Sequence, residues 1–181
     1  MLRDVSIEDA WAIPLPGGGE HRTVADLRSA VLAARAAGPG VAQPLLWVRQ
    51  RIGAWLDRDR PRPDWLAESI SARLEPTDRA RSLVEPRTPD GSFRLVYRFE
   101  REQLGELRNA AVHAFAALSI ERTSEGYRAY LGVFGMPAHR LTGLYMALIA
   151  PFRRRIVYPA IARSLQRAWI ERYAEAPSSA A

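Results

Sequence analysis

The chain of 181 residues is long enough for one domain with a sizeable core, since 48% of its residues are hydrophobic. It contains no cysteine, which excludes disulfides and thiolate metal sites, and its three histidines are too scattered to predict a zinc site. The net charge of +6 would favour nucleic-acid binding, but all 26 basic residues are arginines spread among 20 acidic ones, so we expect a solvated surface and no nucleic-acid partner.

No part of the sequence predicts targeting or a membrane span. Acidic residues interrupt residues 1–16, where a signal peptide needs a continuous apolar core, and no stretch reaches the roughly 18 apolar residues of a transmembrane helix. We therefore expect a cytoplasmic protein. Residues 143–159 are largely apolar but contain three consecutive arginines, and we interpret this stretch as a helix that covers a buried cavity.

The first half of the chain predicts one strand followed by helices. Residues 5–15 predict a strand that ends in a proline and glycine run. Residues 23–38 predict a helix with Thr23 as its N-cap, and Pro44 opens a second predicted helix over residues 44–59.

From residue 78 the pattern changes to strands. Residues 79–86, 92–100, 108–122 and 127–136 each predict a strand, and hydrophobic side chains alternate with polar ones in the second of these. The sequence TSEG joins the last two as a hairpin. The second half therefore predicts an antiparallel meander.

Residues 139–173 predict a long helix with one apolar stripe. A straight helix of this length would reach about 50 Å, whereas a globule of this size is only about 40 Å across. We therefore expect the helix to bend or break at Pro151 and Pro159. The small, polar tail over residues 175–181 predicts disorder.

The order of strand, two short helices, antiparallel strands and long C-terminal helix resembles the helix-grip fold of the START-like (SRPBCC) superfamily. That superfamily includes lipid-transfer, pollen-allergen-type and polyketide cyclase/dehydrase proteins. Residues 45–56, 108–118 and 141–159 resemble an actinobacterial group within it that is designated only as a domain of unknown function. The resemblance implies an α+β helix-grip domain over residues 1–174, in which a curved antiparallel sheet wraps the last helix around an apolar tunnel. It carries over no catalytic residue.

Three residues are candidate catalytic groups. His113 is a lone imidazole in an apolar strand, and imidazole exchanges protons near neutral pH. Asn109 shares its face by strand parity and has an amide that can orient a carbonyl or enolate oxygen. The hydroxyl of Tyr97 can donate to a substrate carbonyl. Each residue also has a structural interpretation: a satisfied core histidine, a strand-end asparagine or a buried tyrosine.

Six further residues are candidate ligand-binding groups, because ligand pockets are mostly apolar with a few orienting polar groups. Trp47, Trp55 and Tyr145 would form the pocket wall or the core, and the hydroxyl of Tyr130 could donate to a substrate carbonyl. The other two lie where the last helix begins, near the expected cavity mouth, where an arginine could hold a carboxylate or phosphate. The six are Trp47, Trp55, Tyr130, His139, Arg140 and Tyr145.

The expected function is binding of an apolar small molecule, such as a polyketide, terpenoid or lipid. Shape templating with acid/base help would allow a cyclase or dehydratase reaction that needs no cofactor and no metal. The sequence leaves two alternatives open, which are a non-catalytic carrier and a peripheral membrane protein that binds through its last helix. Exposed strand edges also make a homodimer an open possibility.

Overall fold

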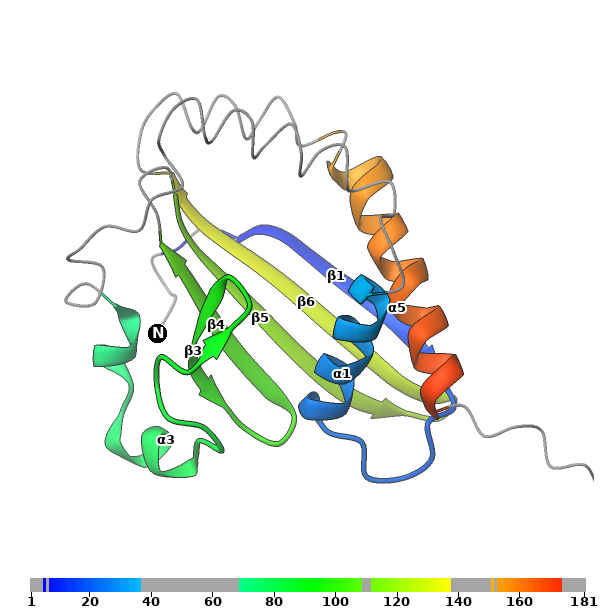
Figure 1. The fold of residues 1–181 in the computed structure, drawn as a ribbon, viewed down its shortest axis with the longest axis horizontal. Coiled ribbons are helices and arrows are strands. Elements are labelled where there is room, and N and C mark those ends of the chain that lie inside the picture. Colours follow the sequence, from blue (N-terminus) through cyan, green and yellow to red (C-terminus); the bar gives the residue numbers. More distant parts are fainter. Residues whose placement is uncertain are drawn as a thin grey trace, which may run out of the picture.

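The computed structural model describes residue 5 and residues 7–36, 69–108, 112–137, 151 and 153–173. These residues form an α+β fold, in which helices pack on a curved antiparallel sheet and the C-terminal helix lies across one of its faces (Figure 1). The predicted fold class is thus confirmed at the level of α+β architecture.

The sheet has six strands in the order β1-β6-β5-β4-β3-β2, and all neighbouring strands are antiparallel. The first strand therefore pairs with the last, while the others follow one another as the predicted meander. The strands are β1 (Ile7–Pro16), β2 (Pro89–Asp90), β3 (Phe93–Arg98), β4 (Glu102–Arg108), β5 (Val112–Thr123) and β6 (Gly126–Pro137).

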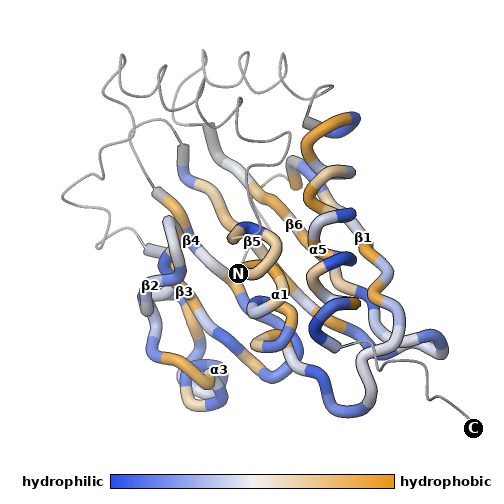
Figure 2. Tube along the Cα trace, turned by 45° about the vertical axis from the view of Figure 1, so that its right-hand side comes forward, coloured by the Kyte–Doolittle hydropathy of each residue, from blue (hydrophilic) through white to orange (hydrophobic). Residues whose placement is uncertain are grey.

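The helices divide between the two faces of the sheet. Helices α1 and α5 lie side by side on one face, which we call the helix face (Figure 1). The 3₁₀ helix η1 packs near β3 on the other face, which we call the outer face. Along α5 hydrophobic and hydrophilic residues alternate (Figure 2). The helical segments are α1 (Val24–Ala36), η1 (Ile70–Arg73), α3 (Pro76–Arg81), the π-helix η2 (Arg153–Val157) and α5 (Tyr158–Tyr173).

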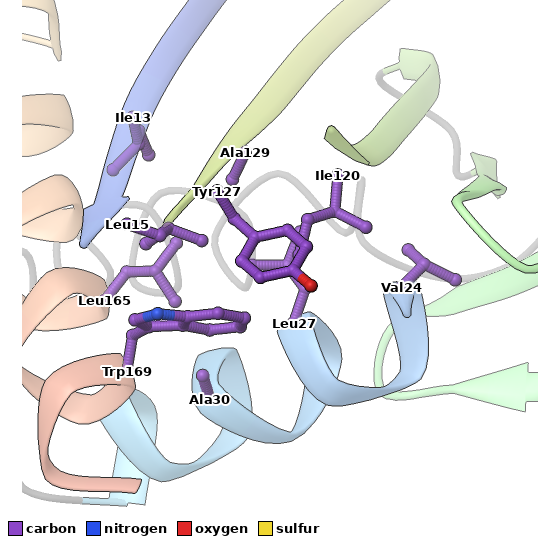
Figure 3. Close-up of a cluster of buried hydrophobic side chains, with 10 residues drawn as sticks. All are labelled: Ile13, Leu15, Val24, Leu27, Ala30, Ile120, Tyr127, Ala129, Leu165 and Trp169. Carbon is purple, nitrogen blue, oxygen red and sulfur yellow. The ribbon is translucent and has the colours of Figure 1, made fainter. Parts of the chain in front are cut away.

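A close-packed core fills the space between the sheet and the two helices of the helix face (Figure 3). Trp169 of α5 is fully buried at its centre and meets Tyr127 of β6 edge to face, with ring centroids 5.8 Å apart. The apolar side chains Leu165 and Trp169 of α5 are thus buried in this core. The other buried members of this core are Ile13, Leu15, Val24, Leu27, Ala30, Ile120 and Ala129.

The outer face carries a second, smaller core. Phe115 and Ile120 are five residues apart on β5, which has no bulge, so they point to opposite faces. Phe115 packs with Ile70 of η1 and with Val96 and Leu104 of the sheet. Segment η1 is therefore held to the outer face by apolar contacts.

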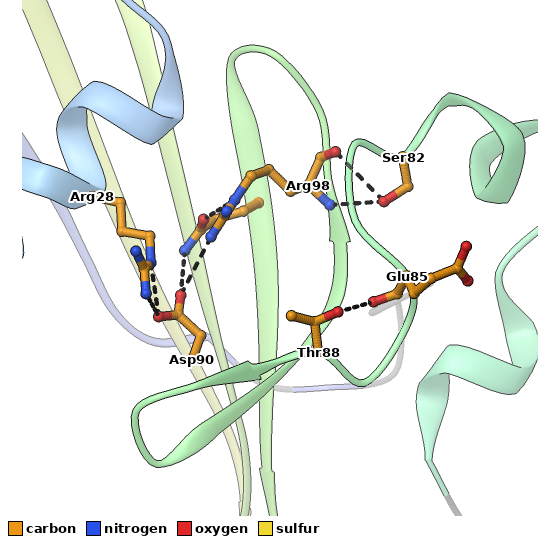
Figure 4. Close-up of polar contacts among 7 residues, drawn as sticks. Arg28, Ser82, Glu85, Thr88, Asp90 and Arg98 are labelled. Carbon is orange, nitrogen blue, oxygen red and sulfur yellow. Dashed lines mark hydrogen bonds and ion pairs between the residues drawn. The ribbon is translucent and has the colours of Figure 1, made fainter.

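A polar network fastens α1 to the far edge of the sheet (Figure 4). Arg28 donates to Oδ1 of Asp90 from Nε at 2.8 Å, and Gln103 donates to Oδ2 at 3.3 Å while accepting from Arg98. Burial alone would raise the pKa of Asp90, but the guanidinium of Arg28, followed by that of Arg98, brings it below its usual value. These groups satisfy one another, so we assign the network a structural role.

The structure differs from the predicted elements between residues 76 and 108. The strand expected over residues 79–86 is absent from the structure: Pro76 and Asp78 suit the first turn of a helix, which is α3, and turns follow it. Strand β4 was not predicted, because its sequence EQLGELR lacks a clean apolar alternation. The predicted helix over residues 44–59 and the tail over 175–181 lie outside the described residues.

The last helix changes type between its two prolines, and the predicted bend or break at Pro151 and Pro159 stays a prediction. Residues 153–157 form a π-helix, and regular α-helix begins at Tyr158, directly before Pro159. Proline has no backbone N–H to donate, and Pro159 lies where the hydrogen-bond pattern of the helix changes. Within the ranges described here, no helix is long and apolar enough to cross a membrane.

The β5–β6 hairpin gives a direct test of this fold. Gly126 has a φ of +140°, and a Cβ there would lie 2.5 Å from the backbone nitrogen of Gly17. We predict that Gly126→Ala lowers the free energy of unfolding by about 3 kcal/mol or more. Gly91→Ala is the matched control, with a φ of +63° but its nearest atom at 3.7 Å, and should cost about 1 kcal/mol. Equal losses in urea unfolding would contradict this packing.

Candidate functional site

A cluster of polar side chains is buried on the outer face, where β4 and β5 pass beneath η1. It consists of Ser69, Ser71, Glu106 and His113, and we call it the Glu106 cluster. His113, the leading catalytic candidate from the sequence, is therefore placed beside a carboxylate.

Strand register explains how the cluster forms. Glu106 of β4 lies opposite Phe115 of β5, and His113 is two residues before Phe115, so all three point to the outer face. Ser69 is the N-cap of η1, whose Ile70 side chain anchors that segment in the outer core. The sheet thus presents the carboxylate and the imidazole, and η1 covers them.

Glu106 is the centre of the cluster. Its side chain is only 1% exposed, and it receives three hydrogen bonds. Oε1 accepts from His113 Nε2 at 2.6 Å and from the backbone N–H of Ile70 at 3.1 Å, while Oε2 accepts from Ser69 Oγ at 2.5 Å. Both carboxylate oxygens are therefore held.

These donors keep the buried carboxylate charged. Burial alone would raise the pKa of Glu106, but hydrogen bonds from His113, Ser69 and the backbone of Ile70 outweigh it, so the pKa lies below its usual value. An ionised carboxylate can only accept hydrogen bonds. Each neighbour must therefore point its proton toward Glu106.

This requirement gives every hydrogen bond in the cluster a direction. Ser69 donates its one hydroxyl proton to the hydrogen bond with Glu106. In the 2.8 Å contact between the two serine oxygens, Ser71 must therefore be the donor. The Ser69 hydroxyl donates its hydrogen bond to the carboxylate of Glu106, whereas in a Ser-His-Asp triad the serine donates to the histidine. Ser69 is therefore not placed as an activated nucleophile.

His113 is the group of the cluster that can exchange a proton with a ligand. Its Nε2 carries the proton shared with Glu106, and its Nδ1 has no hydrogen-bond partner in the described part of the chain. The side chain is 17% exposed and lies against Phe115, with ring centroids 4.6 Å apart. An imidazole oriented by a carboxylate at one nitrogen and accessible at the other is suited to acid/base chemistry.

Tyr97 shares the outer face but takes no part in the cluster. Its ring packs against the outer core and stacks on Phe99, with centroids 4.5 Å apart. Burial raises the pKa of Tyr97 to about 12, and the carboxylate of Glu102 adds to the effect. It is thus a neutral phenol at pH 7, and its catalytic role stays a prediction.

Tyr130 lines a shallow hollow of about 360 Å³ on the sheet, and its hydroxyl donates to Glu121 Oε2 at 2.8 Å. The other lining residues are mostly small, and they are Ala10, Trp11, Ala12, Ala117, Ser119, Leu131 and Gly132. The remaining predicted site residues lie outside the described residues, so their roles stay predictions: Asn109, Trp47, Trp55, His139, Arg140 and Tyr145.

Sequence reasoning missed Glu106 and Ser69. A glutamate in a strand ordinarily faces water, and Ser69 is 37 residues away from it. Strand alternation could have indicated the burial of Glu106, because Glu106 is two residues after the buried Leu104 and therefore lies on the same face of β4. Over the ranges described, no group of three or more histidine, aspartate or glutamate residues is placed to bind a metal.

Comparison with known proteins gives one match. A family model described as "Protein of unknown function (DUF2867)" matches residues 1–160. No curated protein and no solved structure matches the chain.

The Glu106 cluster predicts a specific pH dependence of stability. Because the folded pKa of Glu106 lies below 4.5, its contribution is complete above pH 4.5 and is lost as the pH falls through the folded value. We expect Glu106→Gln to cost about 2–3 kcal/mol at pH 7, as for hydrogen bonds to a charged group. The gap between the two proteins in urea unfolding should narrow from pH 4.5 downward.

The exposed Glu125 supplies the control for this experiment. Glu125→Gln should change the free energy of unfolding by less than about 0.5 kcal/mol at pH 7, as is usual for a surface substitution. A Glu106→Gln variant as stable as the wild type at pH 7 would contradict the buried, ionised carboxylate.

Proposed function

Since the chain belongs to the DUF2867 family, whose description assigns no activity, we propose a function from the Glu106 cluster. The protein binds a neutral, largely apolar small molecule on the outer face of the sheet, and His113 exchanges a proton with it. The ligand class is a polyketide, terpenoid or lipid-like molecule that carries a carbonyl or hydroxyl group.

The observation that carries this proposal is the 2.6 Å contact between His113 Nε2 and the buried Glu106 carboxylate. This contact holds the proton on Nε2, so in the neutral ring Nδ1 is the basic nitrogen. When Nδ1 takes up a proton, the adjacent carboxylate stabilises the imidazolium without any movement of the protein. The same arrangement serves a base in one step and an acid in the next.

The surroundings favour an uncharged ligand. The half-buried Phe134 and Tyr97 contribute apolar surface on the same face, where they pack against the core around Phe115. The buried negative charge of Glu106 would repel an anionic ligand at close range. A carbonyl compound with a long or cyclic hydrocarbon portion fits both conditions.

The proposed reaction is removal of a proton from the carbon next to a carbonyl. His113 Nδ1 takes the proton, and the C–H electron pair moves into an enolate. The imidazolium then returns its proton either to a different carbon of a conjugated enolate or to a β-hydroxyl group, which leaves as water while the enolate electrons form the new C=C bond. The first outcome is isomerisation and the second is dehydration, and neither needs a redox cofactor.

We also propose that the fold is of the helix-grip, START-like type. The curved antiparallel sheet with a C-terminal helix across one face is compatible with it (Figure 1). His113, however, points away from α5, so this chemistry lies opposite the tunnel that the resemblance implies. Residues 139–150, which belong to the helix predicted from the sequence, lie outside the described residues.

A non-catalytic carrier is the second candidate, and the hollow beside Tyr130 favours it. This hollow has a mostly apolar lining and a volume of about 360 Å³, and it is shallow, so a ligand there would stay partly exposed to solvent. Membrane binding has less support, because Leu165, Ala168 and Trp169 of α5 are buried. The only large apolar side chains exposed on the described part of that helix are the isolated Ile161 and Ile170. Native mass spectrometry followed by organic extraction distinguishes a carrier, which would retain its ligand chemically unchanged.

Acid/base activity can be tested without knowing the natural ligand. We use the neutral bicyclic ketone α-tetralone in D₂O and follow exchange of its α-protons for deuterium by NMR. The wild type should accelerate the exchange, and His113→Ala should reduce the acceleration about 100-fold, as expected for loss of a general base. His21→Ala is the matched control, because His21 is an exposed histidine elsewhere, and should leave the rate unchanged. Equal rates for the wild type and His113→Ala would refute the proposal.

A further inference from the structure

Ser69 lies at the point where η1 meets the carboxylate of the cluster. We propose that Ser69 is a positioning residue for His113, which holds Glu106 in the orientation that the acid/base site requires. This inference rests on the proposed function of His113. It adds that the site is complete only when η1 is docked on the outer face.

The hydrogen bonds to Glu106 show why Ser69 matters. Oε1 has two donors, His113 and the backbone N–H of Ile70, whereas Oε2 has Ser69 alone within the described part of the chain. Without the Ser69 hydroxyl, Oε2 would be a buried charged atom without a partner, which is costly. Rotation of the carboxylate could then bring Oε2 to a new hydrogen-bond donor. The same rotation would distort the hydrogen bond between Oε1 and His113 Nε2.

Ser69 is itself held in place. Its Oγ accepts from the backbone N–H of Ser71 at 3.2 Å and from the Ser71 hydroxyl at 2.8 Å. The bond from the backbone is the N-cap of η1, so the hydroxyl proton is left free to point at Glu106. Ile70 between them is buried in the outer core. One short segment thus supplies both a fixed hydroxyl and a backbone donor.

Arginines lie on the elements beside Glu106. On β3 the residue opposite Glu106 is Arg94, which is exposed, and on η1 the charged residue is Arg73, also exposed. On β5 the titratable neighbour is His113, which already bonds Oε1. The contribution of Ser69 should therefore be visible in the titration of Glu106.

The test compares Ser69→Ala, Ser69→Thr and Ser71→Ala by carbon-13 NMR of the Glu106 carboxyl group over a pH series. Loss of one donor to a charged carboxylate should raise the titration midpoint of Glu106 by about 1 pH unit in Ser69→Ala. Ser69→Thr keeps a hydroxyl and should stay near the wild type. Ser71→Ala removes one contact that orients Ser69 and should give a smaller rise.

The same variants are assayed for α-tetralone exchange. Ser69→Ala should slow the exchange that depends on His113 by about 10-fold, the lower end of the loss seen when groups that orient a metal-bound histidine are removed, and Ser69→Thr should restore it. A purely structural role for Ser69 would not predict this rescue together with the shift in Glu106.

Each outcome decides the inference. An unchanged Glu106 midpoint in Ser69→Ala overturns it, even if His113→Ala still abolishes exchange and the proposed function stands. If wild-type exchange does not depend on His113, the proposed function fails and takes the positioning role with it, whatever the Glu106 midpoint. If Ser69→Ala does not fold, Ser71→Ala decides, because a rise in the midpoint supports the role of Ser69 and an unchanged midpoint contradicts it.

Discussion

The outer face is organised by one requirement, which is that a buried carboxylate must be hydrogen-bonded or lose its charge. Glu106 sits in the middle of β4 with almost no exposure, so its oxygens need donors from within the protein. The donors come from η1 and β5, which are far apart in the sequence. Their convergence fixes η1 on the sheet and gives His113 a defined orientation.

The two faces of the sheet differ in what they bury. On the helix face, Trp169 and its neighbours form an apolar core, and a polar network centred on Asp90 ties α1 to the strands. The outer face has a smaller apolar core beside the Glu106 cluster. The stability contributed by the packing on the helix face can offset groups on the outer face that lower the free energy of unfolding. A buried carboxylate is such a group, and strained or costly features of this kind are common at functional sites.

Sequence patterns predicted the elements whose periodicity is local. The helix expected over residues 23–38 is α1 (Val24–Ala36), and the hairpin of β5 and β6 follows from alternating segments joined by TSEG. His113 was recognised because an imidazole is conspicuous among apolar residues. Local patterns therefore located one member of the cluster.

The rest of the site depends on pairing between distant segments. Strand β4 has glutamates and a glycine where alternation is expected, so neither the strand nor the burial of Glu106 could be predicted from it. The contact with Ser69 joins segments 37 residues apart, and it forms only after η1 packs on the sheet. Strand parity alone also could not say that His113 faces away from α5.

The most direct test of this account is nitrogen-15 NMR of the His113 imidazole at neutral to mildly alkaline pH. We predict that the neutral ring carries its proton on Nε2, hydrogen-bonded to Glu106, and that Nδ1 has the resonance of an unprotonated nitrogen. In Glu106→Gln this preference should weaken. A proton found on Nδ1 in the wild type, or a resonance that does not respond to Glu106→Gln, would contradict an acid/base site held by the buried carboxylate.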